Sequence, residues 1–187
     1  MSTIEMPHDF LEVLKRAQAG DQDAFSMLYT EYATPLFRYI YFRLPRKEDA
    51  EDILQTVFLK AYKALPRFRD LGKSPLTFFY TIARNTIIDH VRRKREVLLD
   101  SEAPSLETVP DDTNMADDLL RASDAAGIHD AMTILTDDQR DAITLKYMND
   151  LSNMEIAHVL QKEETAIRQL QSRGLRVLRS QLLKKRT

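Results

Sequence analysis

The sequence contains no cysteine and no tryptophan, and glycine occurs only four times among its 187 residues. Without thiols the chain cannot form a disulfide framework, a zinc–cysteine site or a cysteine nucleophile. So few glycines argue against an all-β protein, which needs many tight turns. No apolar stretch approaches the roughly 20 residues needed to cross a bilayer, and Met1 to Asp9 lacks a signal-peptide pattern. We therefore expect a cytoplasmic protein with no membrane insertion.

Charge is nearly balanced overall but unevenly distributed. The formal net charge is −2, which by itself would argue against a nucleic-acid partner. Between Asp100 and Ala126, however, the sequence contains eight acidic residues and a single base, Arg121. Basic residues are concentrated instead at 92–95 and 168–186. This segregation leaves a nucleic-acid partner possible, because the distribution of charge matters more than its sum.

Hydrophobic periodicity predicts an all-α protein made of two small helical domains. Apolar residues recur at helical spacing over 10–17, 21–45, 47–65, 76–95 and 116–135, with Pro35 expected to kink or restart the second helix. Three shorter helical units follow and complete a four-helix second domain. The acidic segment 98–115 has no apolar period and indicates a flexible linker. The predicted domains are therefore 1–97 and 116–187, joined by 98–115.

The second domain ends in a pattern typical of a helix-turn-helix. Thr136 to Gln139 and Ser152 to Glu155 are capping boxes, and the break at 161–163 precedes a long basic helix from Glu164 to about Lys184. In such a unit the second helix enters the major groove. We expect five apolar or small residues to seat this helix: Ile167, Leu170, Gly174, Leu175 and Leu178. The side chains left to read DNA are Arg168, Gln169, Ser172, Arg173 and Arg176. An ordinary amphipathic helix with a solvated basic face is the alternative.

The helix at 76–95 combines an aromatic start with a basic end. Aromatic side chains can stack on unpaired bases, and basic ones can follow a phosphate backbone. Taken alone, the aromatic residues fit a buried core better, with the arginines as a solvated helix end. The candidate DNA-binding set for this helix is Phe78, Phe79, Tyr80, Asn85, Asp89, Arg92 and Arg93.

No residue set in the sequence supports catalysis or cofactor binding. Asp49, Glu51 and Asp52 have no further ligand at metal spacing, so we interpret them as first-turn acids or a partner-docking face. The four histidines share no common spacing, and no glycine-rich phosphate loop is present. We expect no enzyme activity, no metal and no cofactor.

Taken together, these motifs resemble the extracytoplasmic-function (ECF) sigma factors of the sigma-70 family. The stretch 49–62, DAEDILQTVFLKAY, resembles the polymerase-docking helix of that family. The stretch 77–95, TFFYTIARNTIIDHVRRKR, resembles its promoter-melting helix, and 151–157, LSNMEIA, with the following helix resembles the domain that reads the upstream promoter element. This chain departs from the family pattern at Phe78, where Trp is usual, and at Gln161, where Gly is usual. The family also commonly has a base at Leu170 and Leu at Gln171.

The resemblance implies a transcription-initiation factor that directs core RNA polymerase to specific promoters. Its docking residues on the clamp of the β′ subunit would be Asp49, Asp52, Gln55, Phe58 and Tyr62. The helix at 76–95 would bind the downstream (−10) element, and the last helix the upstream (−35) element. An anti-sigma factor is the usual regulator in the family, and a free monomer is expected. Because the acidic linker can fold over basic surfaces, we expect the isolated chain to bind promoter duplex poorly.

Two alternatives remain open from the sequence. A helix-turn-helix regulator acting without polymerase would normally be a dimer that reads two half-sites, and it has little use for the docking stretch. A helical adaptor that binds only proteins would show no salt-sensitive affinity for DNA. Gel filtration and a pull-down with core polymerase separate these alternatives from a sigma factor.

Overall fold

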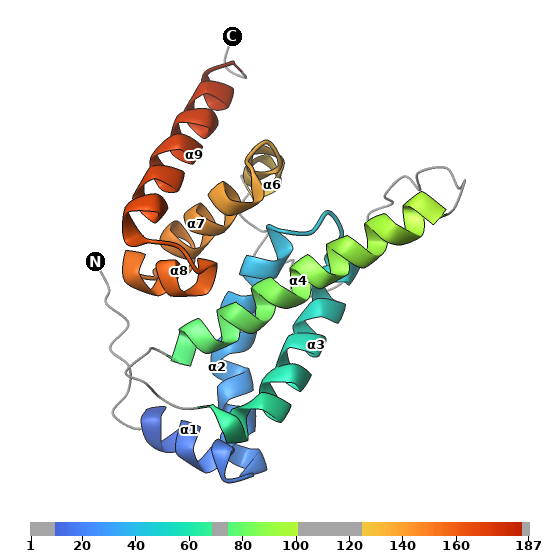
Figure 1. Ribbon diagram of the computed structural model, residues 1–187, viewed down its shortest axis with the longest axis vertical. Helices are drawn as coiled ribbons and strands as arrows, with labels where there is room; N and C mark the ends of the chain where they lie inside the picture. Colours follow the sequence, from blue (N-terminus) through green and yellow to red (C-terminus); the bar gives the residue numbers. More distant parts are fainter. Residues whose placement is uncertain (1–9, 69–74, 101–124, 185–187) are drawn as a thin grey trace.

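The computed structural model describes residues 10–68, 75–100 and 125–184. Within these ranges the chain is all-helical, in agreement with the predicted fold class (Figure 1). The first four α-helices form an N-terminal lobe, and the last four form a C-terminal lobe. Their bounds are α1 Phe10–Gln18, α2 Gln22–Tyr41, α3 Lys47–Ala64, the 3-10 turn η1 Leu65–Arg67, α4 Pro75–Asp100, α6 Ala125–Thr133, α7 Asp137–Tyr147, α8 Asn153–Leu160 and α9 Glu164–Lys184.

Local sequence signals account for most helix boundaries. Gly20 takes φ +93 after α1, a conformation that favours glycine. The carboxylate of Asp21 then accepts hydrogen bonds from the backbone N–H groups of Asp23 and Ala24, which caps α2. Both predicted capping boxes are present, at Thr136–Gln139 before α7 and at Ser152–Glu155 before α8. Each satisfies backbone donors that the first helical turn leaves free.

Pro35 does not interrupt α2, contrary to the expected kink or restart. The helix runs from Gln22 to Tyr41 through Pro35. Proline removes one backbone donor and so weakens a helix interior. Here Leu36, Phe37 and Ile40 follow it directly and are buried in the core, so packing keeps the helix continuous.

The helix-turn-helix forms as predicted, with an unusual residue at the turn. Gln161 ends α8 in the left-handed conformation, φ 53 and ψ 47, and its N–H bonds back to the carbonyls of Ala157 and His158. Gly174 lets α9 approach α7 closely, because a Cβ at this position would lie 2.5 Å from Cδ1 of Ile143. Leu175, predicted to seat the helix, is instead exposed, and Gln171 is buried in its place.

The two lobes pack directly against each other and share one hydrophobic core. Helix α8 lies on α4, and α7 meets α2 (Figure 1). The main core cluster combines residues of α2, α3 and α4 with seven from the C-terminal lobe: Ala142, Leu145, Leu151, Ile156, Val159, Leu160 and Ile167. The linker is therefore not the only connection between the lobes.

Several predicted boundaries differ in the structure or lie outside the described residues. Helix α4 continues to Asp100 rather than ending near Arg95, so its last residues overlap the predicted linker 98–115. Val91, expected on the buried side of this helix, is exposed. The remainder of the linker, the start of the predicted helix at 116–135 and the Ser74 cap lie outside the described residues.

Candidate nucleic-acid interface

The exposed face of α9 carries all five residues predicted to read duplex DNA. Arg168, Gln169, Ser172, Arg173 and Arg176 are each exposed. Arg168 pairs with Glu164 one turn earlier on the same helix, and both side chains remain open to solvent. Ile167 is fully buried and Leu170 partly buried on the opposite side. The helix therefore presents a polar, mostly basic face outward.

A polar contact inside the helix-turn-helix fixes how α9 lies on α8. Gln171 is buried, and its Nε2 donates to Oδ1 of Asn153 at 2.9 Å. Asn153 is the first residue of α8. A hydrogen-bonded amide thus lies within the otherwise apolar buried stripe of α9. This contact explains why Gln171 rather than Leu175 joins the buried stripe.

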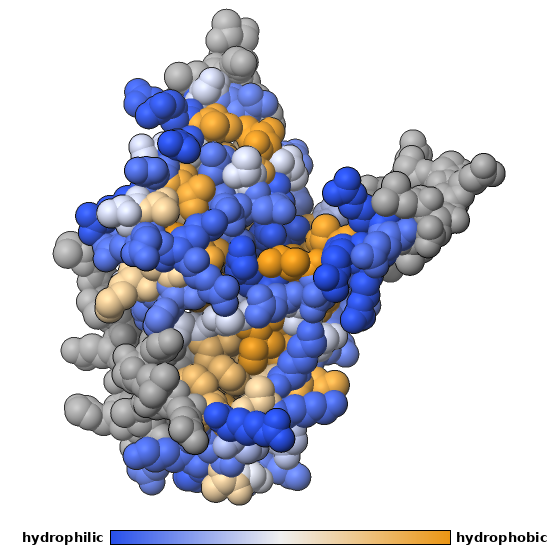
Figure 2. All heavy atoms as spheres, viewed as in Figure 1, coloured by the Kyte–Doolittle hydropathy of each residue, from blue (hydrophilic) through white to orange (hydrophobic). Residues whose placement is uncertain are grey.

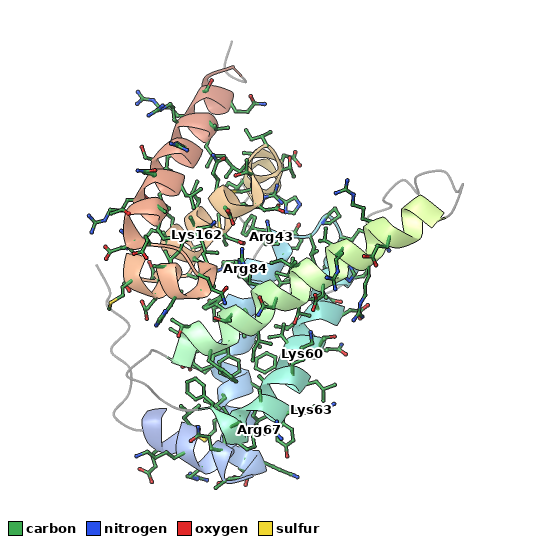
Figure 3. The ribbon with its side chains drawn as sticks, viewed as in Figure 1. Arg43, Lys60, Lys63, Arg67, Arg84 and Lys162 are labelled. Carbon is green, nitrogen blue, oxygen red and sulfur yellow. The ribbon has the colours of Figure 1, made fainter. Side chains whose placement is uncertain are left out.

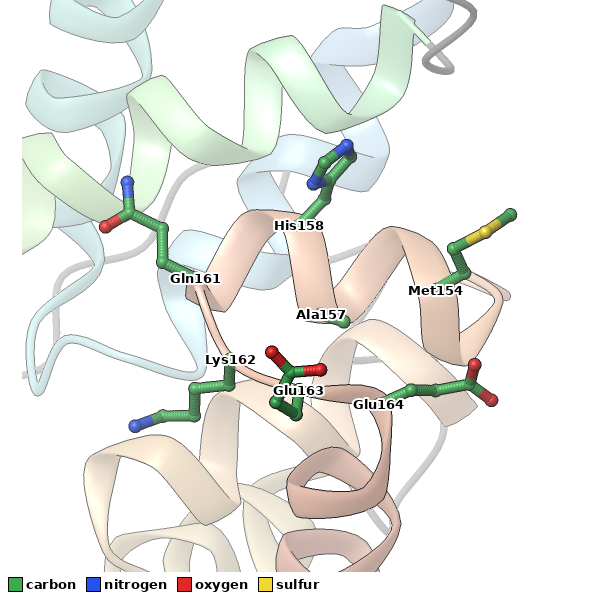
Figure 4. Close-up of a pocket in the computed structure, with 7 residues that line it drawn as sticks. All are labelled: Met154, Ala157, His158, Gln161, Lys162, Glu163 and Glu164. Atoms are coloured by element: carbon green, nitrogen blue, oxygen red, sulfur yellow. The ribbon is translucent and has the colours of Figure 1, made fainter.

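The outer surface of the helix-turn-helix contains a shallow hollow between α8 and the start of α9 (Figure 4). Its volume is about 460 Å³. Its rim is mostly polar, and it is lined by Met154, Ala157, His158, Gln161, Lys162, Glu163 and Glu164. Because charges of both signs line it, the hollow does not have the apolar character of a small-molecule site.

Helix α4 exposes the polar half of its predicted DNA-binding set. Asn85, Arg92 and Arg93 are exposed, and Asp89 is half-buried. Asp89 pairs with Arg92 at 3.5 Å on the helix surface. Asn85 and Arg93 are accessible as they stand, whereas Arg92 is paired with Asp89 and with Glu96 on the same helix.

The aromatic half of that set behaves differently. Phe79 and Tyr80 are completely buried, so neither can contact DNA in this arrangement, and we correct their assignment to core residues. Phe78 remains partly exposed and lies 4.6 Å, between ring centroids, from Phe68. Of the three aromatics, Phe78 is the one whose ring stays partly accessible.

The predicted docking face on α3 is largely accessible. Asp52, Gln55 and Tyr62 are exposed, and neighbouring Leu59 adds apolar surface. Asp49 is less free, because Lys94 of α4 holds its carboxylate at 3.0 Å. Figure 2 shows a mostly hydrophilic surface on which hydrophobic side chains gather in separate patches.

Phe58 does not belong to the accessible docking face. It is buried against Tyr29 and Phe79, at centroid distances of 4.5 and 5.8 Å. A direct polymerase contact by Phe58 is therefore excluded in this arrangement. The sequence pattern was compatible with a docking residue and also with a core residue. Phe58 lies four positions after Leu54, on the same helix face as that core leucine.

A polar network that no sequence pattern predicted lies at the junction of the lobes. The carboxylate of Asp141, on α7, accepts a hydrogen bond from the hydroxyl of Tyr39 at 2.9 Å. Arg43 approaches the same carboxylate at 3.1 Å and Arg84 at 3.4 Å. The Asp141 side chain is only 1% exposed and that of Arg43 only 4%. No local spacing signals this cluster, because Tyr39 and Asp141 lie 102 positions apart along the chain.

Burial controls ionisation in this network. Desolvation raises the pKa of Asp141 above its usual range, although Arg43, Tyr39 and Arg84 all favour the charged carboxylate. Desolvation likewise raises the pKa of the Tyr39 hydroxyl well above its usual value, and the negative charge of Asp141 adds to the effect. Tyr39 therefore stays protonated at neutral pH and acts as a hydrogen-bond donor.

The described residues contain no group of three or more histidines or carboxylates that could hold a metal ion. In the same ranges, no helix is long and apolar enough to cross a membrane. The predicted binding residues that are accessible lie on the outward faces of α3, α4 and α9.

Comparison with known proteins assigns both lobes. Sigma-70 region 2 matches residues 28–97, and sigma-70 region 4 matches residues 126–178. The ECF RNA polymerase sigma factor SigW of Bacillus subtilis is 31% identical over 177 residues, which cover 90% of this chain and 94% of SigW. BldN of Streptomyces coelicolor, another ECF sigma factor, is 35% identical over 90% of this chain, but the match spans only 64% of BldN.

Solved structures agree with the fold. The sigma factor RpoE, in complex with the anti-sigma factor NepR from Bartonella quintana, superposes with a TM-score of 0.73 and 22% identity over 84% of this chain and 96% of RpoE. CnrH, in complex with the cytosolic domain of CnrY, gives a TM-score of 0.71 at 22% identity over 96% of this chain and 99% of CnrH. At this identity the likeness concerns the fold.

Proposed function

Because the chain belongs to the ECF sigma factors of the sigma-70 family, we propose that it binds core RNA polymerase and directs it to specific promoters. Members of this family are initiation factors, so the chemistry of RNA synthesis belongs to the polymerase. The observation that supports the proposal best is the outward placement of three polar faces, on α3, α4 and α9, in one chain. Neither alternative from the sequence needs all three.

The α3 face is the proposed polymerase contact. It consists of Asp52, Gln55 and Tyr62, with Asp49 available once Lys94 releases it. The aromatic ring of Tyr62 packs edge-on against Phe25 at 4.9 Å, which holds it in place beside the exposed Leu59. An apolar contact flanked by a carboxylate and an amide suits a protein partner. The proposed site is the clamp of the β′ subunit.

The two DNA-binding faces suit different states of the promoter. On α4, Phe78 can stack on an unpaired base while Asn85, Arg92 and Arg93 follow the strand, which fits the −10 element after opening. On α9, Arg168, Gln169, Ser172, Arg173 and Arg176 suit base edges and phosphates of intact duplex, which fits the −35 element. We keep the proposed domain division at 1–97, 98–115 and 116–187.

Partners and location follow from the same assignment. RpoE was solved with an anti-sigma factor, and we propose that a protein of this class also restrains this chain. Sigma factors act on RNA polymerase in the cytoplasm, and we place this chain there. It requires no cofactor for this role, and we expect a monomer when free.

In vitro transcription with core polymerase across a pool of promoters from the source genome tests the function. The paired variant Asp52→Ala with Gln55→Ala should weaken core binding and transcription while leaving the helical circular-dichroism signal intact. A matched pair on α2, Glu31→Ala with Gln22→Ala, removes one acid and one amide from exposed positions outside α3 and should leave both unchanged. Equal core affinity for the two paired variants would rule out this docking face.

A further inference from the structure

Two arginines of the N-terminal lobe form ion pairs, among the described residues, only with the C-terminal lobe. Arg43 approaches Asp137 at 2.7 Å and Asp141 at 3.1 Å. Arg84 approaches Asp138 at 3.5 Å and Asp141 at 3.4 Å. Among the described residues, no carboxylate of α1 to α4 pairs with either guanidinium. Figure 3 shows Arg43 and Arg84 close together where α2 and α4 meet the C-terminal lobe.

These arginines therefore make up an anion site that the N-terminal lobe cannot satisfy by itself. A guanidinium at a buried interface needs a partner of opposite charge, and leaving it unpaired is strongly destabilising. The three aspartates sit on the first turns of α7, so their carboxylates form a compact acidic face. Arginine binds carboxylate and phosphate by the same planar, two-pronged geometry. An acidic protein face and a DNA backbone can thus compete for one site.

The position of Arg84 connects this site with promoter binding. It directly precedes Asn85, which is exposed on α4 and belongs to the proposed −10 set. Helix α8 packs against the same helix. While the lobes stay docked, Asp138 and Asp141 hold the Arg84 guanidinium, so it is not available to DNA that follows α4.

We propose that Arg43 and Arg84 bind phosphate groups of promoter DNA when the lobes separate, and that the aspartates of α7 occupy this site in the free protein. The proposal deepens the proposed function and rests on it, since it names a further contact in the same promoter complex. Most of the acidic linker 98–115, which we expected to shield basic surfaces, lies outside the described residues; in the proposal the aspartates of α7 cover Arg43 and Arg84 alone.

Lobe separation is measured by energy transfer between two dyes. Because the chain has no cysteine, Lys63→Cys and Ser180→Cys provide two exposed labelling positions, one in each lobe. Asp137→Asn combined with Asp138→Asn should lower transfer efficiency, and added salt should lower it in the unsubstituted chain. The control, Asp130→Asn with Asp150→Asn, removes the same charge from exposed positions of the same lobe and should leave transfer unchanged. Asparagine tolerates the positive φ of residue 150.

Measurements of DNA affinity distinguish phosphate binding by Arg84 from a mere increase in the fraction of open chains. The probe is a fluorescent single-stranded oligonucleotide of mixed sequence, because phosphate contacts do not depend on sequence. The Asp137/Asp138 variant should bind it about three- to tenfold more tightly than the control pair, since apparent affinity rises with the open fraction. Arg84→Gln should open the lobes as far as the Asp137/Asp138 variant does, but it should not increase the affinity for the oligonucleotide. Its log–log salt slope should be smaller by about 1, the loss of one phosphate contact.

Unchanged energy transfer in the Asp137/Asp138 variant, and no response of the unsubstituted chain to salt, would refute the latch, that is, the ion pairs of Arg43 and Arg84 with the aspartates of α7 as the contacts that hold the lobes together. Equal gains in oligonucleotide affinity for the aspartate variant and Arg84→Gln would refute the phosphate site while leaving the latch intact. Promoter-directed transcription is measured on the same preparations. Its absence in the unsubstituted chain would overturn the proposed function independently of the two other readouts.

Discussion

Asn149 donates a hydrogen bond from Nδ2 to the phenolic oxygen of Tyr80 at 2.7 Å, and thereby joins the turn after α7 to the middle of the N-terminal lobe. The same amide nitrogen donates to the backbone carbonyl of Pro35 at 2.8 Å. Tyr80 is fully buried, and burial raises the pKa of its hydroxyl, so it remains protonated. A residue that the sequence suggested for DNA binding instead helps to hold the lobes together.

Tyr80→Phe should reduce the free energy of unfolding by about 1 kcal/mol, the usual net contribution of one buried hydrogen bond. Urea denaturation of Tyr80→Phe, Asn149→Ala and the double variant forms a thermodynamic cycle with an expected coupling of about 1 kcal/mol. Tyr147→Phe changes an exposed tyrosine of the same lobe as Asn149 and should have almost no effect. Additive losses in the cycle would show that this contact contributes nothing.

Gly174→Ala should destabilise the C-terminal lobe unless Ile143 is shortened. The added Cβ would lie 2.5 Å from Ile143 Cδ1, and overpacking a core typically costs about 1–3 kcal/mol. The higher helix propensity of alanine offsets up to about 1 kcal/mol of this loss. Ile143→Val removes the clashing atom, so it should cost less stability in the Gly174→Ala background than in the unsubstituted chain. Thermal denaturation of the four proteins measures this, and equal costs in both backgrounds would contradict the close approach of α7 and α9.

Gln161→Gly should stabilise the chain by about 1 kcal/mol. Gln161 occupies the left-handed region at φ 53, which costs a side-chain-bearing residue about 1–2 kcal/mol and costs glycine little. Asparagine at this position should fall between the two. Chemical denaturation reports the order, and the reverse control Gly20→Ala, at φ +93 with open space around its Cβ, should destabilise. A loss of stability in Gln161→Gly would refute the argument from backbone strain.

Arg173→Ala and Asn85→Ala should impair different steps of initiation. Loss of Arg173 from the exposed face of α9 should cost about 1–3 kcal/mol of affinity for the upstream element, in a sequence-dependent manner. Loss of Asn85, or of Arg92, should leave closed complexes intact while thymines of the downstream element lose permanganate reactivity.

A pre-melted promoter bubble distinguishes the two classes. It should restore transcription by the α4 variants, because their defect lies in holding the open strand, but not by Arg173→Ala. Rescue of both classes, or of neither, would disprove this division of labour between the lobes.

The stability of the chain should fall as the pH drops below 6.5, partly because of His129. This ring packs against Tyr41 at 4.8 Å and Phe42 at 6.0 Å, and burial lowers its pKa from 6.5. A base with a lowered pKa in the folded state binds fewer protons there than when unfolded. Its contribution is thus present above pH 6.5 and is lost as pH falls through the window just below that value. His129→Phe should flatten the pH dependence of unfolding in this window, and an unchanged profile would exclude His129 as its source.

Signals confined to neighbouring residues were predictable from the sequence. The two capping boxes, the Asp21 cap and the break at Gln161 each involve groups within a few positions, so residue type and spacing determine them. The outward face of α9 followed from the same helical periodicity.

Contacts between distant segments were not predictable in this way. Phe79 and Tyr80 have the residue types of a base-stacking surface and equally of a core, and only packing against Tyr32 and Tyr39 separates the two roles. Arg43, Arg84 and Asp141 carry no common motif, and their pairing depends on how the lobes dock. Similarly, the hydrogen bond to Asn153 accompanies the burial of Gln171 on α9. Helical periodicity alone had predicted that Leu175 would be buried.

Because the two lobes share one core, we expect the lifetime of this protein in the cell to depend on whether polymerase is bound to it. Leu145, Leu151 and Ile156 are buried against the N-terminal lobe in the same cluster as Leu36 and Ile87, so an open chain without a partner exposes apolar surface on both sides of the junction. Transiently opened chains are the substrates of proteases, and a partner that covers the opened surface shields it. We therefore expect a chain that leaves polymerase with its lobes apart either to close again or to be degraded.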